Sequence, residues 1–296
     1  MTSAAYSTQL ATIDTANGTG TLTYTNVSDA AGTLAARTSW LAGNKNVTVT
    51  TAATVAQLTT IDTANGTGTL TYTNVSDAAA TVAAATSWLS GIHEVTLSSA
   101  ATVAQLTSID TANGTGAVTY TDVSDTGAAL TAATSWLAGD KNVTVTSAAN
   151  TTQLTTIDTA NGTGTLTYTN VSDAAGTLAA RTSWLAGNKN VTVTTAATIA
   201  QLGTIDTANG SGSLTYSAIT DSASSLVSGG TASTYIASGD NVSVTGTANV
   251  AQLTAIDAAN GNGTLTYSSI ADAAATLAPG GVASGLVGSG VGVTLT

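Results

Sequence analysis

The sequence predicts an α/β fold: a single elongated solenoid of about twelve strand-helix turns, with one parallel sheet and coils of the leucine-rich-repeat size class. Three observations predict it. An Ile-Asp pair recurs at a nearly constant step along the chain, each step contains two short strand-forming runs, and an alanine-rich segment with helical spacing follows each run.

The repeat is defined by the aspartates of the Ile-Asp pairs. They are Asp14, Asp62, Asp110, Asp158, Asp206 and Asp257, so the steps are 48, 48, 48, 48 and 51 residues. Because no linker interrupts the period, we expect one domain over residues 1–296. Its six repeats have approximate limits of 1–45, 46–93, 94–141, 142–189, 190–240 and 241–296.

Each repeat is expected to contain two strands and two helices in alternation. Residues 47–50 and 70–73 alternate threonine with β-branched, leucine or tyrosine side chains, as half-buried strands do. Residues 55–61 and 78–89 place apolar side chains on one helical face. Consecutive strands should be parallel. The expected strands begin near Leu22, Leu70, Val118, Leu166, Leu214 and Leu265 in one set, and near Val47, Val95, Val143, Val191, Val242 and Val291 in the other.

Cap and turn residues separate these elements. Thr51 and Ser28-Asp29 provide side-chain oxygens ahead of helices, and Asn65-Gly66 tolerates a positive φ after one. Ser228-Gly229-Gly230 in the fifth repeat and Pro279 in the sixth predict that the second helix is shortened there.

Composition excludes several functions. Charged residues are 7% of the chain and the net charge is −11, so we do not expect a nucleic-acid partner. With no cysteine and one histidine, there is no material for disulfides, zinc sites or nucleophilic triads, and we do not expect an enzyme. The sequence has no run of about 18 apolar residues, so we do not expect a membrane span. The N-terminal residues lack the features of a classical signal peptide.

A threonine face is predicted on the strands, opposite the apolar side chains. Its members are Thr21, Thr23, Thr25, Thr48, Thr50, Thr69, Thr71 and Thr73. The T-x-T rows resemble those of ice-binding β-solenoids, in which a flat lattice of hydroxyl and methyl groups meets ice. The alternatives are that threonine is simply a good strand former, or that this face packs against another subunit.

Acidic residues occupy two positions in each repeat. Those of the first position are the six aspartates of the Ile-Asp pairs, near helix C-termini and ahead of Asn-Gly loops, where a calcium site is one interpretation and a local Asx turn the other. Those of the second position precede helices, where capping explains them. They are Asp29, Asp77, Asp125, Asp173, Asp221 and Asp272.

Aromatic residues also recur with the repeat. They are Trp40, Trp88, Trp136 and Trp184, with Tyr24, Tyr72, Tyr120, Tyr168, Tyr216 and Tyr267. Equivalent rings two strands apart are separated by about 9–10 Å, too far to stack directly. We expect them to fill the same space in each layer, with the tyrosines inside; a sugar-binding strip is the alternative.

The two ends of the chain predict self-assembly. Residues 3–17 align with the first helix of the repeat, and residues 291–296 align with the strand that precedes that helix. We expect the last strand of one subunit to continue into the first turn of the next, which is a head-to-tail contact. The residues expected at this contact are Ser3, Tyr6, Leu10, Val291, Val293 and Leu295. The alternative is that these limits are fragment boundaries.

The tandem patterns VTVT-x-AATVAQLTTID and GTLTYT-x-VSDAAxTLAA resemble the Thr-, Ala-, Val- and Asp-rich repeats of very large bacterial cell-surface proteins, including S-layer-like and type I-secreted repeat proteins. The resemblance covers residues 3–296. It implies an extracellular location, export without an N-terminal signal, calcium-assisted folding and a structural or adhesive role.

We therefore expect an extracellular structural protein that assembles with itself, head to tail, into a filament or surface layer. The alternatives are an ice- or surface-binding solenoid that uses the threonine face, and an adhesin repeat segment that binds calcium or cell-surface glycans.

Overall fold

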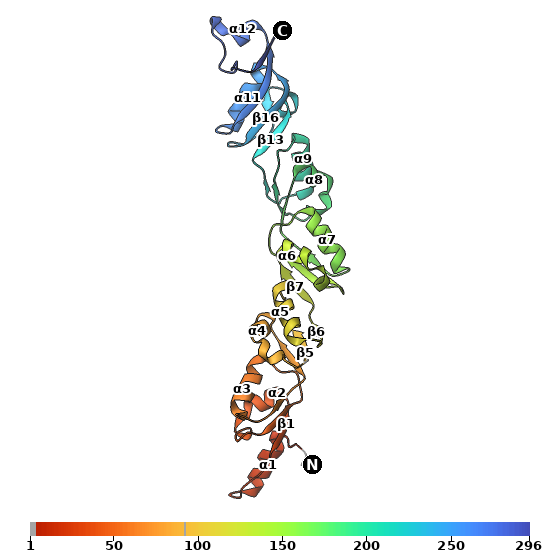
Figure 1. Ribbon diagram of the computed structural model, residues 1–296. Helices are drawn as coiled ribbons and strands as arrows, with labels where there is room; N and C mark the ends of the chain where they lie inside the picture. Colours follow the sequence, from red (N-terminus) through yellow and green to blue (C-terminus); the bar gives the residue numbers. More distant parts are fainter. Residues whose placement is uncertain (1–3, 92) are drawn as a thin grey trace. The chain divides into compact units, whose positions relative to one another are not determined.

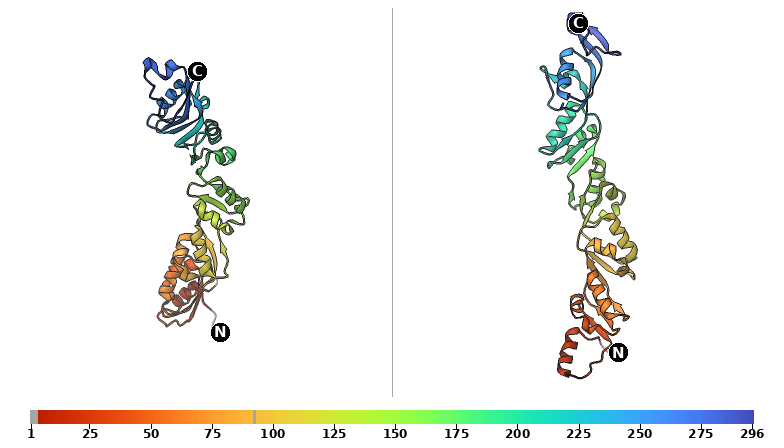
Figure 2. Two further views of the ribbon diagram at one scale, coloured as in Figure 1. Left: turned by 45° about the horizontal axis from the view of Figure 1, so that its top comes forward. Right: turned by 90° about the vertical axis from the view of Figure 1, so that its left-hand side faces the viewer.

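The computed structural model describes residues 4–91 and 93–296 and shows an α/β protein. The chain divides into two compact units. The first comprises Met1–Asp125, Ala129–Thr144 and Thr159–Thr167, and the second comprises Thr126–Ala128, Val145–Asp158 and Tyr168–Thr296. Each contains the predicted alternation of strand and helix (Figure 1), which Figure 2 shows from two further sides. The organisation as one domain over 1–296 stays a prediction.

The longer helix of each repeat has 11 residues, and its ends follow from the sequence. These helices are α1 (Ser7–Asn17), α3 (Val55–Asn65), α5 (Val103–Asn113), α7 (Thr151–Asn161), α9 (Ile199–Asn209) and α11 (Val250–Asn260). At the start of α3, Thr54 and Gln57 form a capping box, in which each side chain accepts the other residue's backbone N–H. Gly66 ends the helix with φ 73° and donates its N–H to the Asp62 carbonyl.

The shorter helix is followed by a 3₁₀ turn in most repeats. These helices are α2 (Ala31–Ala36), α4 (Ala79–Ala84), α6 (Gly127–Ala132), α8 (Ala175–Ala180), α10 (Ala223–Leu226) and α12 (Ala274–Leu277). The 3₁₀ turns are η1 (Thr38–Trp40), η2 (Thr86–Leu89), η3 (Thr134–Leu137), η4 (Thr182–Trp184) and η5 (Pro279–Gly281). In the fifth repeat, β14 (Val227–Ser228) and β15 (Thr231–Ala232) form an antiparallel pair in place of a 3₁₀ turn. The predicted shortening is confirmed, since α10 and α12 have 4 residues.

The remaining strands are parallel and lie in several small sheets. The three-stranded sheets are β1 (Asn26–Asp29), β2 (Asn46–Val49) and β3 (Leu70–Thr71); β4 (Asn74–Asp77), β5 (Glu94–Leu97) and β6 (Val118–Thr119); β7 (Asp122–Asp125), β8 (Asn142–Val145) and β9 (Leu166–Thr167); and β10 (Asn170–Asp173), β11 (Asn190–Val193) and β12 (Leu214–Thr215). A four-stranded sheet contains β13 (Ala218–Ser222), β16 (Asn241–Ala248), β17 (Leu265–Asp272) and β18 (Gly292–Leu295).

A one-residue bulge lies where the small sheets are separated from one another. Val47 pairs with Leu70 and Ala53 pairs with Val75, so the five residues between Val47 and Ala53 oppose four residues on the other segment. The mismatch falls beside Tyr72, where the ladder is interrupted between β3 and β4. In the last sheet, β16 and β17 carry the same kind of irregularity within continuous strands.

The first predicted strand, near Leu22, is wrong within the described residues, because strand β1 starts only at Asn26. Its equivalents near Leu70 and Val118 pair with the strand that begins one half-repeat earlier. Among the described residues, no strand lies beside residues 21–24. An extended segment without a partner strand forms no ladder.

The core is made of small and branched side chains on the inner faces of the strands and helices. In the second repeat, Leu58, Ile61, Val75, Val82 and Leu89 are all fully buried. Alternate strand residues such as Thr48 point outward. The core is therefore thin, and each layer depends on its neighbours for cover.

Candidate functional site: the exposed repeat surfaces and the threonine face

Ile13 on α1 is exposed, although its equivalents in every later repeat are buried. It is 49% exposed, whereas the equivalents are 0% exposed. They are Ile61, Ile109, Ile157, Ile205 and Ile256. The difference lies in the surroundings, since the helices have nearly the same sequence.

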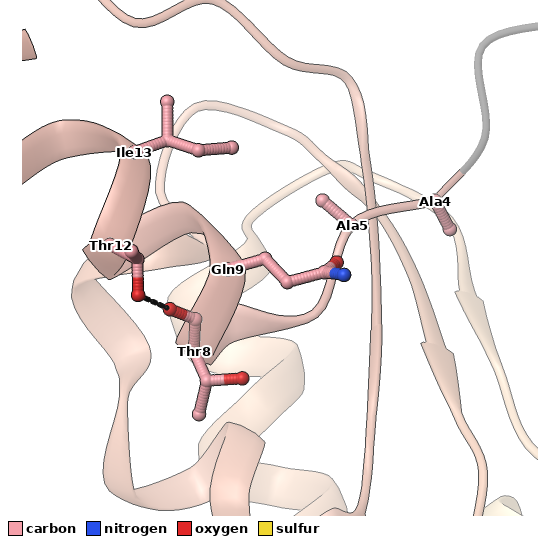
Figure 3. Close-up of a pocket in the computed structure, with 6 residues that line it drawn as sticks. All are labelled: Ala4, Ala5, Thr8, Gln9, Thr12 and Ile13. Atoms are coloured by element: carbon pink, nitrogen blue, oxygen red, sulfur yellow. Dashed lines mark hydrogen bonds between the residues drawn. The ribbon is translucent and has the colours of Figure 1, made fainter. Parts of the chain in front are cut away.

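The surroundings that bury Ile61 come from the preceding half-repeat. Helix α3 packs mainly against α2 and η1, and α9 packs against α8 and η4. Among the described residues, α1 has its main contact with β1 instead. It borders an open hollow lined by Ala4, Ala5, Thr8, Gln9, Thr12 and Ile13. Figure 3 shows Thr8, Thr12 and Ile13 on the helix beside the segment that carries Ala4 and Ala5.

Asn17, the last residue of α1, is exposed in the same way. In later repeats the equivalent asparagine is buried at the end of the helix, and these residues are Asn65, Asn113, Asn161, Asn209 and Asn260. The buried side-chain amides bond to the loop just before β5 or β8. Asn113 Oδ1 accepts the His93 N–H at 2.9 Å, and Asn161 Nδ2 donates to the Lys141 carbonyl at 3.1 Å.

A second exposed apolar surface lies on β18. Val293 is 47% and Leu295 is 66% exposed. Their equivalents in the second repeat, Val95 and Leu97, are 1% and 6% exposed. Val282, after η5, is also exposed. The inward-facing side chains of β18 thus lack the cover that a following helix gives to β5.

The residues predicted for self-assembly fall into different environments. Ser3 lies outside the described residues, and Leu10 is 2% exposed because it is buried within the first repeat. Tyr6, Val293 and Leu295 are exposed, and Val291 is half-buried. Sequence reasoning missed Ile13 and Asn17. The repeat alignment identifies their equivalents, but only the structure shows that those equivalents are buried.

The threonines of the predicted face are exposed. Thr21, Thr23, Thr25, Thr48, Thr50, Thr69, Thr71 and Thr73 all point to solvent. Parallel pairing sets the hydroxyl residues side by side: Ser28 is paired with Thr48, and Thr48 with Thr71. Val47 and Val49 alternate with them and point inward.

The second acidic position of each repeat caps the longer helix. Asp77 Oδ2 accepts the Val55 N–H at the start of α3 at 3.1 Å, and its Oδ1 accepts the Ala78 N–H at 2.8 Å. The same contact to a long helix recurs for Asp29, Asp125, Asp173, Asp221 and Asp272. The sequence predicted capping but not that the capped helix precedes the aspartate in the chain.

The first acidic position lies near the helix C-termini, on the surface. Asp14, Asp62, Asp110, Asp158 and Asp257 are exposed, and Asp206 is half-buried, where Oδ2 accepts the Tyr235 hydroxyl at 3.1 Å. Calcium prefers six to eight oxygen ligands, and the described residues contain no cluster of three or more acidic, histidine or cysteine side chains. Calcium at these aspartates stays a prediction.

The aromatic residues pack against one another within each repeat. The Tyr72 hydroxyl donates to the Trp88 carbonyl at 2.7 Å, and the rings meet edge to face at 6.1 Å. His93 stacks on Tyr72, in the place where Lys45 lies over Tyr24. The tyrosines are half-buried, except for Tyr120, which is buried as predicted. The contacts explain the recurrence by packing; glycan binding stays a prediction.

Burial also raises the pKa of the repeated tyrosines. The shift is largest at Tyr216, whose pKa rises to about 12 through burial and the nearby Asp240, Tyr235 and Asp206. The Tyr216 hydroxyl donates to the Tyr235 carbonyl at 2.6 Å, so the neutral form is held in the fold.

No protein-family model matches the chain, and neither a curated protein nor a solved structure matches it. Among the described residues, no helix has the length and apolar character needed to cross a membrane.

Proposed function

We propose that this chain is a structural protein that assembles with itself head to tail into a filament or surface layer. In this proposal the repeats form a solenoid, and the surface of α1 on one copy meets the surface of β18, α12 and η5 on another. Following the resemblance to bacterial cell-surface repeats, we place the assembly outside the cell or on its surface.

The exposure of Ile13 carries the proposal. The equivalent isoleucines of the five later repeats are completely buried, whereas Ile13 is about half exposed. The elements packed against α3, α5 and α9 are a short helix and a 3₁₀ turn, and those packed against α11 are α10 with β14 and β15. Helix α12 and η5 are elements of the same kind, and Val282 beside them is exposed. A second copy therefore offers a cover of the required type.

Light scattering and negative-stain electron microscopy of the 296-residue chain test the proposal. We expect concentration-dependent oligomers and thin filaments from the unaltered chain. Ile13→Asp and Leu295→Asp should each leave a folded monomer, because these side chains are exposed in the single chain. Thr96→Asp, which adds the same charge on an exposed strand position, is the matched control and should still assemble. One-chain mass at every concentration, with and without calcium, would refute the proposal.

The threonine face favours a second candidate, binding to ice or another ordered surface. Its support is that threonines such as Thr48 and Thr71 are both exposed and paired in register. Thermal hysteresis of the monomeric Ile13→Asp variant measures this function without filaments. We expect Thr48→Lys to lower the hysteresis if the face binds ice, and an unaltered freezing point in the parent variant excludes it.

A further inference from the structure

We infer that the fifth repeat binds a primary alkylammonium group, which lies over the Tyr216 ring and bonds the Asp240 carboxylate and the Tyr216 carbonyl. The group belongs either to a free amine or to a lysine side chain of a partner protein. The inference concerns a different part of the chain from the surfaces proposed for self-assembly and does not depend on them.

In three repeats an ammonium group lies over the ring of the recurring tyrosine. Its nitrogen is 4.2–4.6 Å from the ring centre in the pairs Lys45 with Tyr24, Lys141 with Tyr120 and Lys189 with Tyr168. Lys141 and Lys189 also donate from Nζ to the backbone carbonyl of their tyrosine, each at 2.9 Å. Because an aromatic face and a carbonyl oxygen both attract a cation, each of these tyrosines forms part of an ammonium site.

The fifth repeat keeps the tyrosine but lacks the lysine. Asp240 stands at the position of Lys189, because each lies two residues before the strand valine that aligns across the repeats, Val242 and Val191 respectively. Residues 190–296 contain no lysine, arginine or histidine. No side chain of the fifth or sixth repeat can therefore supply the missing ammonium.

Asp240 is a buried carboxylate, and its repeat contains no counter-charge. The residue is 8% exposed. Among the described residues, its side chain accepts one hydrogen bond, which the Ala237 N–H donates to Oδ2 at 2.9 Å, and Oδ1 accepts none. A buried carboxylate costs free energy unless it is paired with a cation or fully hydrogen-bonded. An ammonium bound beside Oδ1 would remove this cost.

The site is close to the surface. Tyr216 is half-buried, and Ser238 and Gly239, directly before Asp240, are exposed. At the equivalent position of the fourth repeat, Lys189 is half-buried, not fully enclosed. A cation therefore reaches this position from solvent.

The charges around Tyr216 also favour a cation. Burial raises the pKa of Tyr216 to about 12, and Asp240 is the first of the charged neighbours that add to the shift. For Tyr168, which lies under Lys189, the charged neighbour that adds to the effect of burial on the pKa is Asp158. The fifth repeat thus has an anion where the fourth has a cation. A negative potential that opposes ionisation of a tyrosine attracts a positive ligand.

The acceptors fit a primary ammonium better than they fit other cations. A primary ammonium has three N–H donors, of which the Tyr216 carbonyl and Asp240 Oδ1 would each accept one while the ring faces the charge. A quaternary ammonium has no N–H to donate. Calcium prefers six to eight oxygen ligands, and the part of the chain that the structure describes has no cluster of three or more acidic, histidine or cysteine side chains.

The probe for this site is n-butylammonium, which is a lysine side chain without its backbone. Saturation-transfer difference NMR measures its binding to the 296-residue chain at constant ionic strength, for single chains and assemblies alike. We expect saturable binding, against which tetramethylammonium and potassium compete only weakly. Equal competition by potassium overturns the assignment to an ammonium, and the absence of saturable binding overturns the site.

Charge variants locate the binding site. Asp240→Asn should weaken binding by about tenfold or more, because a charge-assisted hydrogen bond becomes a neutral one. Asp240→Lys should abolish binding, because its own ammonium takes the position. Asp257→Asn removes the same charge from an exposed side chain, so it is the matched control and should bind like the unaltered chain. Equal binding by Asp240→Asn and Asp257→Asn contradicts the inference.

Lys189→Asp tests the same arrangement in the opposite direction. It should create an additional site over Tyr168, so equilibrium dialysis should find more n-butylammonium bound per chain than in the unaltered protein. This variant keeps the test decisive if circular dichroism shows that the Asp240 variants do not fold. A folded Lys189→Asp chain with no additional binding contradicts the role given to the carboxylate.

A second ligand, lysine with both backbone ends blocked, identifies the source of the ammonium. If it binds as tightly as n-butylammonium, the site accepts a lysine of a partner protein. If the blocked backbone prevents binding, the site takes a free amine. Both results agree with the inference and distinguish the two sources.

Discussion

Replacing the two recurring aspartates of one repeat by asparagine should have different effects on stability, a loss at Asp77 and no loss at Asp62. Asp77→Asn keeps the shape of the side chain but removes its charge and one acceptor. Asp77 accepts two backbone N–H groups, one of them at the start of α3. Asp62→Asn makes the same change near the end of that helix, on an exposed side chain. The pair therefore separates capping from other roles of the carboxylate.

The magnitude follows from these contacts. Replacing a side-chain cap by alanine lowers the free energy of unfolding by about 0.5–2 kcal/mol. Asparagine keeps one of the two acceptor oxygens, so only part of that loss applies, and the lost favourable charge adds ~0.3–1 kcal/mol. We expect Asp77→Asn to lower the free energy of unfolding by about 1–2 kcal/mol. Asp62→Asn removes an anion from a helix C-terminus, where it is unfavourable, so the change should be between zero and a gain of about 0.5 kcal/mol.

Hydrogen exchange measured by mass spectrometry gives a local readout, since repeats need not unfold together. Amides of residues 55–65 should exchange faster in Asp77→Asn and no faster in Asp62→Asn. The measurement is made in calcium and in chelator. If Asp62→Asn loses protection as strongly as Asp77→Asn, our account of the two positions is wrong. If it does so only in calcium, Asp62 is a calcium ligand.

Two further predictions concern the fold. The pKa of Tyr216 is raised from 10.0 to about 12, so its contribution to stability is complete below the unfolded value and is lost as the pH rises through about 12. The unfolding free energy should fall between those pH values, and less steeply in Tyr216→Phe, as urea titrations at several pH values will show; equal slopes contradict this. Gly68→Ala should destabilise by about 1–3 kcal/mol through collision with backbone, whereas Gly20→Ala in the monomer should not, and thermal unfolding compares the two.

The helix and strand positions could be predicted because the repeat presents the same local signals six times. The capping box at Thr54 and Gln57 and the glycine at position 66 define α3 as the spacing suggested. The division into small sheets could not be predicted in this way. The ladder is interrupted beside Tyr72, at a one-residue difference between paired segments that is visible only once Ala53 is known to pair with Val75.

The exposed surface was predicted only in part, for a reason of packing. Leu10 and Ile13 both belong to the apolar face of α1, and the sequence does not separate them. In the structure Leu10 is buried by its own repeat, whereas the equivalents of Ile13 are buried together with the preceding half-repeat. Which neighbour covers a side chain is a property of the stack, so the residue that needs a partner could be chosen only from the structure.

The exposed side chains also set a limit on the strength of the junction. Ile13, Val293 and Leu295 are each about half to two-thirds exposed. Full burial of such side chains contributes about 1.5–3 kcal/mol each, so the exposed parts of these three supply roughly 2–5 kcal/mol. Association of two separate copies costs about 4–15 kcal/mol in lost translational and rotational freedom, which an internal interface does not bear. Apolar burial alone would not hold a filament. In the proposed assembly, polar and backbone contacts would have to contribute the rest, and we therefore expect assembly to be reversible and to begin only above a threshold concentration.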